Sequence, residues 1–542
     1  MSITRIIGGT LTKTATGNIE LHATNGNVNL SAATHNNWSG EENGIVYHDY
    51  EVPHPADIMN NILDLTLNLF FDGTTNNRNN TEQREKDTSI YQRKSNKKDD
   101  SYENDYTNIA KAYELIDVDK QLRVYVEGVG TTDEKSDDML PVGIAQSAGF
   151  WSTGIKDKVR KACEKGAIEV KKAAKGKPID SLTINVFGFS RGAASARHFL
   201  SITDSAPYTV KVSDKGQFLL PGAMMPLQYP INIEDKTKPP YPESFGVKFG
   251  LFGRYLAEQG VFEIKEFIFN FVGLYDTVSS HGFSHNNDVK DLGLKAVRKA
   301  KMIFQISAAD EYRENFDLTN IDSAGFKGLE LTFPGVHSDI GGSYLALDVE
   351  RSVVYAETYM EIRDQNNNFV PYTKNTDIFK ELLVNEGWYQ SHELLPEYKY
   401  DKKKTYLVGT RKLENTYDKI ALNKMIMVSK QEQFGVLYDS GKEKKKTNIS
   451  DPFIADVFTQ LTNYSKAVMA HRNKAIKGEK TVDQYITESK QISYLDYIDT
   501  EDLKKLRNKY LHWSVKADQF GLEPRFTEIL PVEKRKREIH NG

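Results

Sequence analysis

Short apolar runs alternate with helix-like segments through the middle of the chain. The apolar runs, each typical of a buried strand, are Leu65–Phe71, Leu122–Val126, Leu182–Phe187, Phe267–Tyr275 and Leu329–Phe333. The helix-like segments are Tyr106–Leu115, Gly154–Ala174 and Ala193–Leu200. Strands and helices that alternate in this way indicate a mostly parallel sheet flanked by helices. We therefore predict an α/β core over residues 62–345.

The remaining segments have other patterns. Residues 78–103 are polar and charged, and we predict a surface loop there. Residues 203–263 mix prolines with aromatic residues, which predicts an irregular insertion over the site. Residues 346–542 are predicted to be a mainly helical addition that packs on the core, with its clearest helices at 418–434 and 451–475.

Residues 1–55 differ from the rest of the chain. Gly17–Asn25 is followed at once by the similar Gly26–Thr34, and both units alternate apolar and polar residues. Alternation predicts strands with one buried face, and short repeats are typical of β-helical structures. A hairpin packed on its own domain fits the pattern equally well. Residues 35–60 are predicted to form a linker.

Composition and charge narrow the class of protein. The 542 residues carry a net charge of −4, which gives no electrostatic signal for nucleic acid. A single cysteine, Cys163, excludes an intramolecular disulfide and a zinc site built on cysteines. We find no Sec-type signal and no apolar run of transmembrane length. Three basic runs, at 402–404, 444–446 and 534–537, are predicted to lie on solvated faces.

The strand-like run Leu182–Phe187 leads into a serine flanked by glycines, Gly188-Phe-Ser190-Arg191-Gly192, and then into a helix. This strand–turn–helix context is the one a nucleophile elbow requires. A Cβ at Gly188 or Gly192 would collide with the neighbouring strand or helix. The Arg191 N–H, at a helix N-terminus, would form half of an oxyanion hole. A glycine–serine turn without chemistry is the alternative interpretation.

A serine nucleophile needs a base, and the base needs an orienting carboxylate. In hydrolases of this type the chain order is serine, acid, histidine. Asp276 and His337 each follow the end of a predicted strand, so we predict the triad Ser190, Asp276 and His337. Asp339 is the rival acid and His512 the rival base.

The first strand ends in Asp72-Gly73-Thr74, where the backbone N–H of Gly73 or Thr74 would supply the second oxyanion donor. A strand ending in Asp-Gly-Thr is also found in aspartyl-phosphate phosphatases, which use Asp-x-Asp-Gly-Thr. Their nucleophile is the first aspartate, and that position is Phe70 here. The phosphatase interpretation therefore lacks its essential atom.

Four motifs in this order, Phe71–Asn77, Gly188–Ala193, Tyr275–Val278 and Phe333–Gly342, resemble the α/β-hydrolase domain of the type VI secretion lipase effectors of the first lipase-effector family. The resemblance covers residues 62–345 and is patchy around 415–438 and 509–530. The chain departs from the family pattern between His337 and residue 415, and in the repeats at its start. These repeats resemble the β-helical tips of spike proteins, which suggests a spike-docking segment.

The resemblance implies an α/β-hydrolase-like fold and phospholipase A activity on bacterial membrane phospholipids, with Ser190, Asp276 and His337 as the catalytic residues. It implies an antibacterial toxin, made in the bacterial cytoplasm and delivered by type VI secretion to the periplasm or membrane of a target cell. The implied partners are a VgrG-like spike protein or adaptor and a cognate immunity protein. Triad chemistry itself requires no metal and no cofactor.

Two other functions remain open at this stage. One is a carboxylesterase that acts on soluble esters and has no toxin role. The other is a non-catalytic module of a secretion spike that retains only the fold.

Overall fold

The computed structural model describes residues 62–93, 100–137, 154–213, 216–218, 227–228, 243–279, 289–519, 521–525, 529–531 and 534–542. The predicted β-repeat segment at 1–55, with its suggested docking role, lies outside the described residues. The predicted linker at 35–60 also lies outside the described residues, and the first described strand, β1, begins at Leu63.

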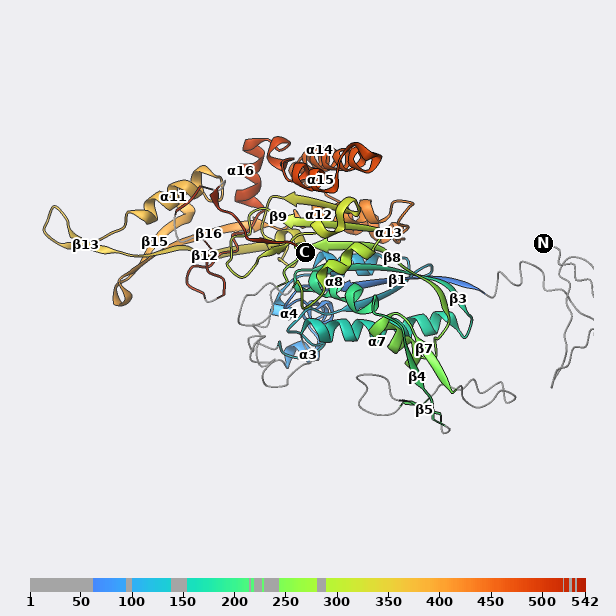
Figure 1. Ribbon diagram of the computed structural model, residues 1–542. Coiled ribbons are helices and arrows are strands. Elements are labelled where there is room, and N and C mark those ends of the chain that lie inside the picture. The colour runs from blue at the N-terminus through green and yellow to red at the C-terminus, as the bar shows by residue number, and fades with distance from the viewer. Residues whose placement is uncertain are drawn as a thin grey trace, which may run out of the picture. The chain divides into compact units, whose positions relative to one another are not determined.

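A six-stranded sheet forms the centre of the described part (Figure 1). Its order is β11-β9-β8-β3-β1-β2, and every neighbouring pair is parallel. The strands are β1 (Leu63–Phe71), β2 (Leu122–Val126), β3 (Ile179–Phe189), β8 (Ile264–Tyr275), β9 (Met302–Ala308) and β11 (Gly328–Phe333). The five predicted strands are all present, and β9 is a sixth that the pattern did not indicate. The α/β-hydrolase-like class is confirmed.

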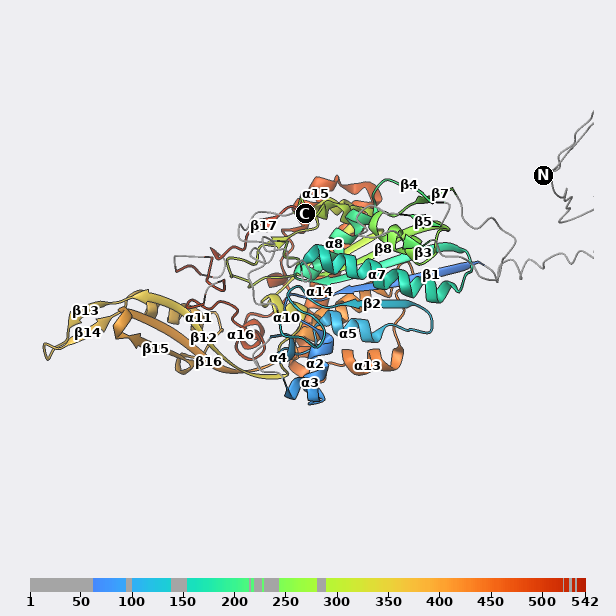
Figure 2. The same cartoon turned by 90° about the horizontal axis from the view of Figure 1, so that it is seen from below.

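Alternate side chains of each strand pack on opposite faces of this sheet, as the period of two requires. On β1, Leu69 and Phe71 join one apolar cluster and Phe70 joins the other. Helices α7 (Ile155–Ala174), α8 (Arg191–Thr203) and α9 (Gly250–Glu258) cover the first face. Helices α5 (Asn108–Leu115), α12 (Asp418–Ser429) and α14 (Pro452–Lys474) cover the second. The C-terminal region therefore completes the core of the α/β domain (Figure 2).

The direction of strand addition reverses between β1 and β3, because β2 lies beside β1 on one side and the later strands follow β3 on the other. In open parallel sheets, ligands bind at the carboxyl ends of the strands where this reversal occurs. The loop after β1 begins at Asp72, and Ser190 follows β3 directly. The topology therefore places both predicted motifs at one edge of the sheet.

The surface loop predicted for 78–103 is wrong for the described residues, which form helices α2 (Arg78–Glu85), α3 (Ser89–Gln92) and α4 (Asp100–Glu103). Side-chain caps begin the first two: Asn77 accepts from the N–H groups of Asn79 and Asn80, and Thr88 accepts from that of Tyr91. Few apolar residues lie in this stretch, so no hydrophobic period reveals these helices in the sequence.

The C-terminal region contains the predicted helices as α12 and α14, together with α13 (Ser440–Thr447), α15 (Val482–Ser489) and α16 (Thr500–Lys509). It also contains an antiparallel sheet that the sequence analysis did not predict. Its strands are β12 (Leu347–Thr358), β16 (Lys404–Glu414) and β15 (Leu394–Lys399), and beside it lie the hairpin β13 (Met360–Arg363) and β14 (Phe369–Tyr372) and helix α11 (Asn375–Asn385). These strands extend away from the central sheet in both views (Figures 1 and 2).

Within the predicted insertion at 203–263, the described residues form the ribbon β4 (Tyr208–Lys211) and β7 (Ser244–Val247) as well as helix α9. The remaining short strands are β5 (Gln217–Phe218), β6 (Leu227–Gln228), β10 (Leu318–Thr319) and β17 (Ile539–His540), and 3-10 or π turns lie at 294–299, 322–327, 391–393, 400–402, 475–479 and 494–496. No helix in the described ranges is long and apolar enough to cross a bilayer.

Candidate active site

Ser190 lies at a strained turn between β3 and α8. Its backbone has φ 60° and ψ −128°, a conformation that residues with a Cβ rarely adopt. Its N–H donates to the Tyr275 carbonyl at 3.0 Å, and its own carbonyl accepts from the Val278 N–H at 3.3 Å. These two bonds attach the serine turn to the loop that carries Asp276. Asp276 is itself in the left-handed region, with φ 43°.

The two glycines of the turn leave room for the backbone of neighbouring segments. A Cβ on Gly188 would lie 2.5 Å from the Gly192 carbonyl oxygen. A Cβ on Gly192 would lie 2.3 and 2.4 Å from the carbonyl oxygens of Asp72 and Phe71. Backbone atoms cannot move aside as the end of a flexible side chain can.

Gly192→Ala is therefore expected to lower the free energy of unfolding by about 1–3 kcal/mol or more, as overpacking does. Gly246→Ala is the matched control, because no atom lies within 4 Å of its added Cβ, and its effect should stay within about 0.5 kcal/mol. Urea unfolding of both variants measures the difference. Equal stabilities would show that the turn can relax around a methyl group.

His337 begins the short helix α10 (His337–Gly341) after β11, and its ring is paired with Asp276. The Nδ1 atom of His337 is 2.5 Å from Oδ2 of Asp276, and both side chains are buried. The His337 ring also packs 4.6 Å from the ring of Phe189, the residue before Ser190, measured between centroids. A buried carboxylate, Glu311, accepts from the His337 N–H at 3.2 Å. The structure thus holds the histidine by its ring and by its backbone.

The carboxylate of Asp276 is held in its charged form. Its Oδ1 accepts from the Ala308 N–H at 2.9 Å, and Arg537 donates to both carboxylate oxygens, at 2.6 and 2.9 Å. Burial alone would raise the pKa of Asp276, but the charge of Arg537 and the bond to His337 outweigh burial and hold this pKa well below its usual range. A charged Asp276 is the form that can orient an imidazole and stabilise its cation.

Arg537 belongs to the basic run 534–537, which was predicted to lie on a solvated face. That prediction is wrong for half of the run. Lys534 and Lys536 are exposed, as expected, but the side chains of Arg535 and Arg537 are only 0% and 6% exposed. Alternate residues point inward here because the segment is extended. It leads into β17, which pairs with β10 in the core. Nothing in the local sequence indicated that a residue of this run would reach the site.

The rival acid and the rival base are paired with each other. Nδ1 of His512 is 2.8 Å from Oδ1 of Asp339, and Oδ2 of Asp339 accepts from the N–H groups of Val336 and His512. The site therefore contains two buried histidine–aspartate pairs. No hydrogen bond or ion pair joins Asp339 to His337 or His512 to Asp276, so the four residues do not form mixed pairs.

Ser190 and His337 line one cavity of about 760 Å³ at the sheet edge, and His512 lines it as well. This volume is typical of a small-molecule site. The Ser190 Oγ has no hydrogen-bond partner among the described residues, and an apo site of this kind need not show the bond between a nucleophile and its base. No described residue of 203–263 lines the cavity, so the described part of the predicted insertion does not contribute to it.

The candidates for the oxyanion hole differ in what their N–H groups already bind. The Arg191 N–H is the first of α8 and has no helical partner. The Gly73 N–H donates to the carboxylate of its neighbour Asp72 at 2.7 Å, whereas the Thr74 N–H has no partner among the described residues. The structure therefore favours Arg191 and Thr74, and it disfavours Gly73.

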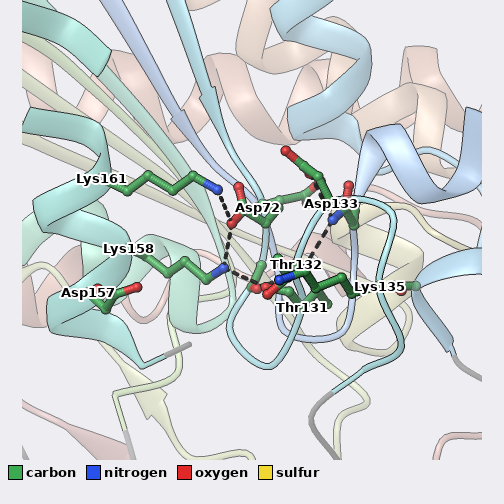
Figure 3. Close-up of polar contacts among 12 residues, drawn as sticks. Asp72, Thr131, Thr132, Asp133, Lys135, Asp157, Lys158 and Lys161 are labelled. Carbon is green, nitrogen blue, oxygen red and sulfur yellow. Dashed lines mark hydrogen bonds and ion pairs between the residues drawn. The ribbon is translucent and has the colours of Figure 1, made fainter. Parts of the chain in front are cut away.

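Ionic contacts join helix α7 to the loop that follows β2 (Figure 3). Lys158 and Lys161 of α7 both donate to Oε1 of Glu127, at 2.8 and 2.6 Å, and Lys158 also donates to the Thr131 carbonyl at 2.7 Å. Burial would raise the pKa of Glu127, but the two ammonium groups outweigh it and lower this pKa to about 2. Among the described residues Asp72 has hydroxyl partners and no paired cation, and burial raises its pKa to about 6.

One group of residues has the spacing of a metal site among the residues that the structure describes. Ligand atoms of Asp317, Glu538 and His540 lie within 4.8 Å of one another. Arg525 is ion-paired with both carboxylates, so a cation already compensates their charge. The group is not part of the cavity that Ser190 lines, and we assign it no metal.

The parallel sheet, the strained serine turn and the cavity at the strand ends define an α/β-hydrolase-like protein. Residues 66–360, more than half of the chain, match the catalytic domain of Tle1-like phospholipase effectors of the type VI secretion system (T6SS), and the chain belongs to this family. The protein is therefore a hydrolase of the secreted phospholipase-effector type.

Two solved structures are similar to this chain. The first is described as the Tle1 effector bound to the VgrG spike of the type VI secretion system. It is 19% identical, with 89% of this chain and 94% of that chain covered and a TM-score of 0.52, which supports the fold. The second, an uncharacterized protein from Pseudomonas aeruginosa, is 16% identical over 80% of this chain and 54% of that one, with a TM-score of 0.35. No curated protein sequence matches the chain significantly.

Proposed function

We propose that the protein is a serine phospholipase A that hydrolyses acyl esters of membrane phospholipids. The observation that carries this proposal is the buried pair of His337 and Asp276 on the wall of the cavity that holds Ser190. The family supports the lipid substrate, and the turn geometry supports serine as the nucleophile.

In the proposed mechanism, His337 Nε2 takes the proton of Ser190 as Oγ bonds to the ester carbonyl carbon. The N–H groups of Arg191 and Thr74 stabilise the resulting oxyanion. When the C–O bond of the ester breaks, His337 gives its proton to the departing lysophospholipid oxygen. Water, deprotonated by His337, then releases the fatty acid from the serine. Asp276 stabilises the imidazolium at each stage.

The environment of His337 predicts how activity depends on pH. Burial lowers the pKa of His337 below its ordinary value of 6.5, although the bond to Asp276 opposes this shift. Only neutral His337 can accept the serine proton, so kcat/KM should fall as the pH falls through this lowered pKa and stay level near neutrality. The midpoint of the acidic limb, measured on an uncharged short-chain ester, should lie below about 6.5. A midpoint above about 7 would exclude His337, in this environment, as the base.

In this proposal, the protein is delivered to its target cell in the way that its family implies. The protein would be an antibacterial toxin made in the bacterial cytoplasm, delivered by the T6SS and neutralised in the producer by an immunity protein. The structure described as Tle1 bound to a VgrG spike supports a spike partner for this chain too. The repeats at residues 1–55 are the candidate docking segment.

The test is fatty-acid release from vesicles of phosphatidylethanolamine and phosphatidylglycerol by the purified full-length protein. We expect release of fatty acid together with lysophospholipid. Cleavage of short-chain esters without any release from vesicles would favour the soluble carboxylesterase. Turnover of neither substrate, with or without a spike protein, would favour the non-catalytic spike module.

A further inference from the structure

Arg191 follows Ser190 directly, and its side chain lines the same cavity. Its Nε donates to the Thr74 hydroxyl at 2.6 Å, which fixes the guanidinium beside the serine turn. One of its five N–H donors is used in this bond, and no described residue accepts from the other four.

This guanidinium differs from other arginines on the cavity wall. Arg313 is ion-paired with Glu311 at 2.8 Å, and Arg351 with Glu397 at 2.7 Å. Among the residues that the structure describes, no carboxylate pairs with Arg191. Burial lowers the pKa of Arg191 to about 10, and no neighbouring acid offsets the effect. Arg191 is half-buried, and a partly desolvated cation without a counter-charge is costly, which is typical of a site that binds an anion.

A second polar group on this cavity also lacks a partner. His512 is 3% exposed and lines the cavity, and its Nδ1 is bound to Asp339. Its Nε2 is buried and has no hydrogen-bond partner among the described residues. Tyr344 stacks on the ring, with 3.4 Å between centroids, so the ring is held in place. Protonated at both nitrogens, the ring would donate to Asp339 through Nδ1 and to an anion through Nε2.

We propose that Arg191 and His512 bind the phosphodiester of the phospholipid substrate. This proposal rests on the proposed phospholipase function and names the group that confers specificity. In a phospholipid the cleaved esters and the phosphate share one glycerol, so the phosphate must lie near Ser190 when an ester carbonyl is at Oγ. The planar guanidinium can donate to two phosphate oxygens at once. The phosphodiester is also the group that zwitterionic and anionic headgroups have in common.

The competing explanation is structural, since the bond from Arg191 could serve only to position Thr74 and its backbone N–H. The two roles differ in their dependence on substrate. A positioning role affects every ester equally, whereas a phosphate contact affects only substrates that carry a phosphate.

The experiment compares kcat/KM on monomeric dihexanoyl phosphatidylglycerol with kcat/KM on an uncharged short-chain ester. Arg191→Gln should lower the ratio of phospholipid to ester by about 10- to 100-fold, as expected for a lost hydrogen bond to a charged group. His512→Gln should lower it by about 3- to 10-fold, since the imidazole is the weaker contact. Arg351→Gln is the matched control, because Arg351 lines the same cavity but is already paired with Glu397. It should keep the ratio within about threefold of wild type.

An unchanged ratio for Arg191→Gln, or an equal fall on both substrates, would overturn the proposal. Calorimetric titration with dibutyl phosphate needs no turnover and separates this proposal from the proposed function. Binding to wild type but not to Arg191→Gln supports the phosphodiester site even if phospholipids are not cleaved. Equal binding to both proteins, or binding to neither, overturns the site even if phospholipids are cleaved. Inorganic phosphate in a parallel titration shows whether the site accepts any phosphate or requires a diester.

Discussion

Replacing Ser190 with alanine is expected to lower fatty-acid release from phosphatidylethanolamine and phosphatidylglycerol vesicles by roughly a thousandfold or more. The loss should be this large because the proposed mechanism has no other nucleophile. Ser190 lies on the strained turn and lines the cavity, and in the proposed mechanism its neighbours supply only the oxyanion donors and the base. The residual rate would come from substrate binding and the oxyanion donors.

Ser338→Ala is the matched control. Ser338 lines the same cavity and is adjacent to His337, yet it makes no side-chain hydrogen bond with the described residues. Its loss should change fatty-acid release by less than about threefold. A double variant, Ser190→Ala with His337→Ala, should be no slower than Ser190→Ala alone, because the two residues act as one unit. Release that stays above about a tenth of wild type in Ser190→Ala would contradict the serine mechanism.

The features that could be predicted from the sequence are those that local pattern determines. Five of the six core strands and the long helix α7 carry their own periodicity, and the glycines around Ser190 mark the turn. Parallel strands then bring their carboxyl ends to one edge, so Asp72, Ser190, Asp276 and His337 meet although they are far apart in the chain. The strand β9 was missed, because Gln305 and Ser307 interrupt its apolar run.

The contacts that support the site could not be predicted in the same way. Arg537 lies 261 positions after Asp276, in a run whose composition is typical of a solvated surface. Its burial depends on the pairing of β17 with β10, which no local pattern indicates. Glu311, which accepts from the His337 N–H, likewise follows β9 in a stretch without a motif. Long-range packing decides both contacts.

The order of residues along the chain could not distinguish the two candidate acids, Asp276 and Asp339. Asp276 and Asp339 both follow Ser190, and His337 and His512 both follow Asp276, so most combinations satisfy the expected chain order. Asp339 is only two positions after His337, yet it pairs with His512, 173 positions away. The structure resolves the four candidates into two pairs, His337 with Asp276 and His512 with Asp339.

Replacing Asp276 with asparagine is expected to lower kcat on an uncharged short-chain ester by about 10³- to 10⁴-fold. The carboxylate accepts from Nδ1 of His337 and so keeps Nε2 free to take the serine proton. An amide can donate to Nδ1 instead, which favours the wrong tautomer, and it cannot stabilise the imidazolium. Asp339→Asn changes the other pair in the same way, and it should lower kcat by less than about tenfold because His512 is not the base in this mechanism.

Folding must be separated from chemistry, since Asp276→Asn also leaves the buried Arg537 without its counter-charge, at a cost of about 3–5 kcal/mol. The double variant Asp276→Asn with Arg537→Gln removes that unpaired charge. We expect it to recover much of the lost thermal stability but none of the lost kcat, because restoring the fold does not restore the acceptor for His337. Recovery of kcat in the double variant would mean that Asp276 acts only by neutralising Arg537. A large loss of kcat in Asp339→Asn, with Asp276→Asn close to wild type, would instead make His512 and Asp339 the catalytic pair.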